Sequence, residues 1–88
     1  MSTSKLPLKM SIARLFRDNA PRDKHAVYAE LEPHYGTERQ FSHGMIENHL
    51  MSLKAVGILK TQDAHITPQN ELVRAYVITS FGHSKLPR

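Results

Sequence analysis

Histidine is the residue type in this sequence that is best suited to metal chemistry. Imidazole nitrogens are common metal ligands and titrate near neutral pH. The chain has six histidines and no cysteine. No two histidines stand four residues apart and there is no His-Glu-x-x-His motif, so the spacings that place two zinc ligands on one helical face are missing. The sequence therefore predicts scattered surface histidines and no metal site. These residues are His25, His34, His43, His49, His65 and His83.

Catalytic motifs are also missing from the sequence. There is no Gly-x-Ser-x-Gly turn for a nucleophile, no glycine-rich phosphate loop and no signature of paired carboxylates. With 88 residues, the chain is long enough for one domain with a modest core, which leaves little room for a substrate cavity. We therefore expect a protein that is not an enzyme and that carries no cofactor.

The charge balance is moderately basic, with 12 Lys and Arg against 8 Asp and Glu and a net charge of +4. This balance suits a polyanionic partner, although solubility alone explains it equally well. The absence of cysteine is typical of a reducing compartment, so we expect a cytoplasmic location. No apolar run approaches the ~20 residues that cross a bilayer, so we expect no membrane association.

Two helices are predicted in the first half of the chain. The first spans residues 7–19, and its apolar residues recur at helical spacing. Asp23 is a suitable N-cap for the second helix. Pro33 lacks a backbone N–H and crowds the preceding turn, so this helix is expected to end near Glu32 and to be followed by a loop over 33–40.

The third helix, over residues 42–56, has the clearest signals. Ser42 can cap the free amides of the first turn, and Phe41 and Ile46 occupy the two positions of a hydrophobic staple. Gly57 is placed to be the left-handed residue that ends the helix.

After the third helix the period changes to that of β-structure. Residues 58–62 are expected to form a short strand, and residues 72–79, rich in Val, Tyr, Ile and Thr, the return strand. Between them lies a polar loop over 63–71 that contains the turn-forming sequence Thr67-Pro68-Gln69-Asn70.

The order of elements is therefore helix, helix, helix, strand, loop, strand. This order predicts a mainly α fold with a small β-hairpin, in which three helices enclose one core and the hairpin packs against them. The domain is expected to span residues 7–82, between a flexible N-terminus over 1–6 and a C-terminal tail over 83–88.

This pattern resembles the winged helix-turn-helix domains of bacterial and phage regulators. The resemblance covers Leu8 to Leu86 and rests on HAVYAELEPHYG for the second helix, FSHGMIENHLMSLKAVGILK for the third helix and the first strand, and AYVITSFGHSKL for the end of the wing. The sequence departs from the family in two places. The connection between the second and third helices exceeds the usual 3–4 residues, and no strand is visible between the first and second helices.

The resemblance implies sequence-specific binding of duplex DNA by a small transcriptional regulator. In this family the third helix, here 42–56, lies in the major groove, and the wing, here 63–71, contacts the backbone. Because one domain of this size binds weakly alone, a homodimer on paired half-sites is expected. The implied DNA contacts are Arg39, Gln40, Ser42, His43, Glu47, Asn48, Lys54, Lys60, His65, Gln69, Asn70 and Arg74.

The side chains on the third helix leave two functions open. Asn48 can pair with an adenine edge, and Lys54 can reach a phosphate or a guanine. Glu47 can accept a hydrogen bond from cytosine but repels phosphates. This nearly neutral face keeps a second hypothesis open, in which the chain is a protein-interaction module, such as a phage or mobile-element inhibitor or adaptor, that does not itself bind DNA.

Overall fold

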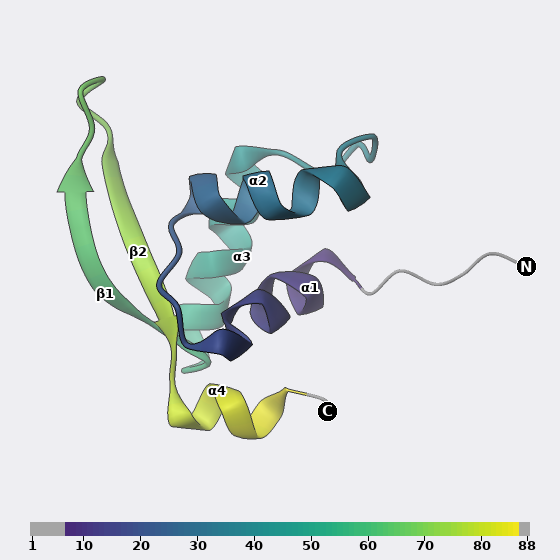
Figure 1. Cartoon of the computed structure of the whole chain (residues 1–88), viewed down its shortest axis with the longest axis vertical. Coiled ribbons are helices and arrows are strands. Elements are labelled where there is room, and N and C mark those ends of the chain that lie inside the picture. The colour runs from purple at the N-terminus through teal and green to yellow at the C-terminus, as the bar shows by residue number, and fades with distance from the viewer. Residues whose placement is uncertain (1–6, 87–88) are drawn as a thin grey trace, which may run out of the picture.

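The computed structural model describes residues 7–86 (Figure 1). The expected flexible segment 1–6 and the last two residues of the expected tail lie outside the described residues. The elements are α1 (Leu8–Leu15), the short 3-10 helix η1 (Phe16–Asp18), α2 (Lys24–Tyr35), α3 (His43–Ala55), β1 (Leu59–Ile66), β2 (Leu72–Ile78) and α4 (Ser80–Lys85).

The three longer helices pack together on one side of the β-hairpin, and the tip of the hairpin projects past them (Figure 1). Their apolar stripes and the inner face of the hairpin share one core, with the rings of Phe16 and Tyr76 among its largest side chains. Burial of this surface is the main force that holds the elements together. The predicted mainly α fold with a terminal hairpin is confirmed. The remaining members of the core are Ile12, Ala13, Val27, Leu31, Tyr35, Phe41, Ile46, Leu50, Leu53, Leu59 and Ile78.

The predicted signals at both ends of α3 are confirmed. The Ser42 hydroxyl oxygen accepts a hydrogen bond from the Met45 amide at 3.1 Å. At the other end, Gly57 has a φ of +88°, the left-handed conformation in which a side chain would be strained. Phe41 and Ile46 are both buried in the core. These two ends fix where α3 begins and ends, and its buried side faces α1 and α2.

The prediction that α2 ends near Glu32 is wrong. The helix continues through Pro33 to Tyr35. Proline still removes one backbone hydrogen bond, but its ring is exposed and Tyr35 is 6% exposed. The Tyr35 hydroxyl is also hydrogen-bonded to Ser11 Oγ at 2.7 Å. Tertiary anchoring of Tyr35 therefore outweighs the local preference of proline to end a helix.

The first four residues of the predicted loop over 63–71 are strand. β1 extends to Ile66 and pairs with β2 in antiparallel register, from Leu59 opposite Ile78 to Ile66 opposite Leu72. A bulge at Gln62 interrupts the pairing. Only residues 67–71 form the turn, closed by a hydrogen bond from the Thr67 amide to the Glu71 carbonyl oxygen at 2.8 Å. The polar composition of 63–65 concealed the strand, because both of its sides are exposed there.

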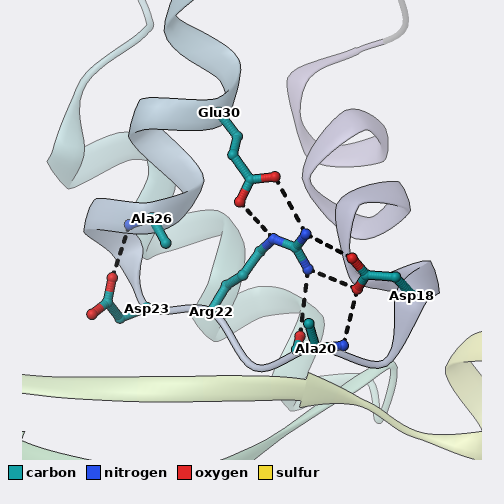
Figure 2. A network of polar contacts seen from close by, with 6 residues as sticks. All are labelled: Asp18, Ala20, Arg22, Asp23, Ala26 and Glu30. Carbon is teal, nitrogen blue, oxygen red and sulfur yellow. Dashed lines mark hydrogen bonds and ion pairs between the residues drawn. The ribbon is translucent and has the colours of Figure 1, made fainter.

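The link between η1 and α2 carries a trace of a third strand, where the sequence showed none. Arg22 forms an isolated antiparallel bridge with Tyr76, through backbone hydrogen bonds of 2.9 and 3.0 Å. The Arg22 guanidinium then joins η1 to α2, because it donates to Asp18 at 2.9 Å and to Glu30 at 2.7 Å (Figure 2). Hydrogen bonding to Asp18 and then Glu30 raises the pKa of Arg22 above its usual range. Arg22 thus ties the helical layer to the edge of the hairpin through its backbone, and η1 to α2 through its side chain.

A short helix, α4, occupies residues 80–85, where the sequence suggested the end of the domain and a tail. The Thr79 hydroxyl oxygen caps it, accepting from the Gly82 amide at 2.8 Å, and Thr79 also donates to the Gly57 carbonyl oxygen at 2.6 Å. Gly82 is buried, and a Cβ at this position would overlap the Ile58 carbonyl oxygen. Glycine is therefore required for α4 to approach the chain that leaves α3.

Candidate nucleic-acid interface

The outward face of α3 is the first component of the candidate interface. Ile46, Leu50 and Leu53 are turned into the core, which leaves a line of residues at helical spacing on the opposite side. We call this line the outward stripe. It consists of Gly44, Asn48, Met51 and Ala55, all of which are exposed.

A shallow hollow of about 350 Å³ lies between α3 and β2. Met51, Lys54 and Ala55 line it from the helix, and Arg74 and Tyr76 line it from the strand. Two cationic side chains from different elements therefore border the same concave surface. An anionic chain that lay along the outward stripe would meet both of them.

Glu47, which lies beside this surface, is engaged in an ion pair. The Lys24 ammonium nitrogen, at the start of α2, lies 3.2 Å from a Glu47 carboxylate oxygen and 2.6 Å from a Glu71 carboxylate oxygen. Hydrogen bonding to Glu71, and then to Glu47, raises the pKa of Lys24. The same contact with Lys24, followed by one with His25, lowers the pKa of Glu71. Two acidic residues beside this surface, Glu47 and Glu71, are thus paired with the same cation.

His43, the first residue of α3, is engaged in an aromatic column. Its ring stacks on Tyr28 of α2 with centroids 3.9 Å apart and planes 7° apart. Tyr28 stacks in turn on Phe41 at 4.5 Å, and His25 lies 5.2 Å from His43. This packing holds the imidazole of His43 against α2. A sequence-based reading had left the ring free to contact a ligand.

None of the remaining candidates near the start of α3 lines the hollow between α3 and β2. Ser42 uses its hydroxyl oxygen to cap the helix. Arg39 and Gln40 are exposed in the loop that precedes it. Gln40 lines a hollow with Pro7 and other residues of the α1 side, and none of these lines the hollow between α3 and β2.

The candidates on the hairpin are divided between its turn and its base. His65, Gln69 and Asn70 are exposed at or beside the turn, and Asn70 has a left-handed φ of +64°. Lys60 borders a separate hollow of about 490 Å³ that also includes Asn19. The structure therefore brings Lys54 and Arg74 together and separates Lys60 from them.

Lys24 is the residue of this surface that escaped sequence reasoning. Lys24 follows a helix cap and has no local signal of its role, because both of its partners come from distant parts of the chain. Met51 is 53% exposed, on the side of α3 that helical spacing places away from the core. Met51 follows Gly44 by seven residues and Asn48 by three. This helical spacing is enough to predict that the three residues share one face.

Two other kinds of feature, a metal-binding cluster and a membrane span, are absent from the described residues. Within residues 7–86, no group of three or more His, Asp or Glu side chains is arranged to hold a metal ion. None of the helices described there is both long and apolar enough to span a bilayer.

The three-helix core, the hairpin and the outward-facing third helix define a winged helix-turn-helix fold. Solved structures agree with this assignment. PadR of Bacillus subtilis, in complex with operator DNA, is similar with a TM-score of 0.71 and 20% identity over 90% of this chain. The similarity covers 44% of that protein, so the chain spans less than half of its length.

Two further structures have the same fold. A protein of Thermoplasma acidophilum has a TM-score of 0.67 at 18% identity, with 90% of this chain and 72% of that chain covered. A PadR-like transcriptional regulator of Bacillus cereus has the same TM-score and identity, with 90% and 73% covered. No protein-family model matches the sequence, and neither does any curated protein.

Proposed function

We propose that this protein binds duplex DNA sequence-specifically, without catalysis, and regulates transcription. The observation that supports this best is the hollow between α3 and β2, where Lys54 and Arg74 flank the outward stripe. A helix of 13 residues is about 20 Å long, and the major groove, roughly 12 Å wide, admits a helix. The similar PadR structure is a complex with operator DNA, which agrees with this use of the fold.

In this proposal the contacts have distinct tasks. Lys54 and Arg74 hold phosphates, and the outward stripe faces base edges. The turn residues His65, Gln69 and Asn70 reach the backbone beside the groove. Because a single domain buries too little surface for tight binding, we also propose that two copies bind paired half-sites.

Binding to duplex DNA across a salt series tests the proposal. Each phosphate contact releases counterions, so the affinity should fall steeply as salt rises. Lys54→Ala and Arg74→Ala should weaken binding to all sequences and reduce the salt slope by about one each. Lys60→Ala is the matched control, because Lys60 borders the other hollow, and it should leave the slope unchanged. No binding to any duplex at low salt would overturn the proposal.

A protein-interaction module remains the second candidate function. Two of the acidic residues that first suggested it, Glu47 and Glu71, are paired with Lys24, but another observation favours it. An apolar groove of about 310 Å³ lies between α1 and α4, lined by Met10, Ala13, Leu53 and Leu86 among others. If the full chain fails to bind DNA, pull-downs with wild type and Met10→Glu should identify a partner that only wild type retains.

A further inference from the structure

The structure limits which groups of α3 can touch a base. Gly44, Asn48, Met51 and Ala55 are exposed along one line of the helix. Nothing lies within 4 Å of the position that a Cβ would take at Gly44, so the helix presents bare backbone there. Met51 is 53% exposed and has no partner in the core cluster. The available chemistry is one carboxamide, one thioether and one methyl group.

The side chains that most often recognise guanine and cytosine are missing from the outward stripe. Guanine is most often read by an arginine that donates two hydrogen bonds, and α3 contains no arginine. Its one lysine, Lys54, lies beside Arg74 in the hollow. Cytosine is read by a carboxylate, and the Glu47 carboxylate is held by Lys24 at 3.2 Å. The His43 ring is likewise held by Tyr28.

The groups that remain match the edge of an A·T base pair. A carboxamide can accept from N6 and donate to N7 of adenine, and apolar side chains contact the C5-methyl group of thymine. Methionine is flexible and polarisable, which suits contact with a methyl group. Asn48 and Met51 are separated by about 4.5 Å along the helix axis, which is close to the 3.4 Å step between stacked bases.

We propose that α3 selects adjacent A·T base pairs, with Asn48 on an adenine and Met51 on a thymine methyl group. This inference rests on the proposed function, because it assigns the bases that the DNA-binding face reads. It gives Lys54 and Arg74 no part in the choice of sequence.

The experiment begins with selection of a preferred duplex from a random pool by the full chain. Each thymine of that duplex is then replaced by deoxyuridine, which removes only the methyl group, and each adenine by 7-deazaadenine, which removes N7. At one thymine we expect wild type to bind about four-fold more weakly, the size expected for one buried methyl group. At one adenine we expect a loss of about ten-fold.

Variants assign each loss to a side chain. Met51→Ala should bind the thymine and deoxyuridine duplexes equally, and Asn48→Ala should bind the adenine and 7-deazaadenine duplexes equally. Lys54→Ala is the control, because it should weaken binding while keeping both differences. Thermal melting checks that these exposed substitutions leave the fold intact.

The outcomes separate this inference from the proposed function. Salt-dependent binding with a preferred site of G·C pairs, or equal deoxyuridine losses in wild type and Met51→Ala, overturns the A·T reading alone. Failure to enrich any duplex, with no salt-dependent binding, overturns both proposals.

Discussion

At the scale of single residues, Lys24 controls the charge of the proposed DNA face. Its side chain is 15% exposed and contacts carboxylates from α3 and from the end of the turn that precedes β2. Without it, Glu47 would lose its ion pair beside the groove, and Glu71 would keep only its contact with the His25 ring. Lys24 therefore affects the charge of the proposed DNA face in two ways, through its own positive charge and by pairing with these carboxylates.

Lys24→Met should therefore weaken DNA binding by roughly two- to five-fold at low salt, the size expected for surface charge pairs. The physical reason is repulsion between phosphates and the two released carboxylates. The triple variant Lys24→Met, Glu47→Gln, Glu71→Gln should recover most of the loss in a fluorescence anisotropy titration. A triple variant as weak as Lys24→Met would show instead that Lys24 contacts a phosphate directly.

Arg22 is a second single residue with a large effect, and this effect is on the stability of the fold. Replacing it by methionine removes charged hydrogen bonds to Asp18 and Glu30 (Figure 2). Because both carboxylates are partly exposed, we expect a loss of about 1–2 kcal/mol in the free energy of unfolding. Urea denaturation measures this loss. Arg39→Met, in an exposed loop, should change stability little, and equal losses in the two variants would contradict the assignment.

At the scale of elements, α4 is held by close packing of its backbone against the segment that links α3 to β1. Its backbone at Gly82 lies against the Ile58 carbonyl group, and the Thr79 hydroxyl ties its first turn to Gly57. A six-residue helix is not stable alone, so packing and capping account for its presence. This contact also closes the end of the core where α3 passes into β1.

Gly82→Ala should destabilise the protein by about 1–3 kcal/mol, because the added methyl group overlaps the Ile58 carbonyl oxygen and α4 must shift. Gly44→Ala is the matched control, since its Cβ would meet nothing within 4 Å. In a helix this substitution is stabilising by roughly 0.5–1 kcal/mol. Thermal melts should move in opposite directions, and a neutral Gly82→Ala would show that α4 is not packed in this way.

At the scale of the whole molecule, acid should loosen the ties between helices and hairpin. Arg22 holds the pKa of Asp18 well below its usual range, and Lys24 followed by His25 lowers the pKa of Glu71. A group whose pKa is lowered by folding stabilises the protein above its unfolded value and loses that effect as pH falls. The unfolded values are about 3.9 for Asp and 4.3 for Glu.

We therefore expect the free energy of unfolding to fall as pH drops from about 5 to 3. Urea denaturation at successive pH values measures this fall. A double variant, Arg22→Met with Lys24→Met, should be less stable near neutral pH and should lose less on acidification. Parallel curves for wild type and the double variant would contradict the assignment of this pH dependence to these two networks.

The parts of the fold that could be predicted from the sequence are those set by interactions between residues close together in the chain. The cap at Ser42, the left-handed Gly57 and the periodic apolar residues of α3 act within a few residues of one another, so the sequence alone shows them. Extension of α2 to Tyr35 depends on Ser11, and α4 depends on its contact at Ile58. Those partners are distant in the sequence, and no local pattern reports them.

The sequence by itself determined the order of helices and strands, because caps and hydrophobic periods are short-range properties. It also determined that α3 would carry both Glu47 and Asn48. Only the tertiary structure decided which of these two side chains is available. Lys24, 23 residues before Glu47, closes an ion pair that ties up the carboxylate, while Asn48 stays exposed one position later. The physical reason is that folding brings charges together across elements, and such long-range pairing leaves no mark on the local sequence.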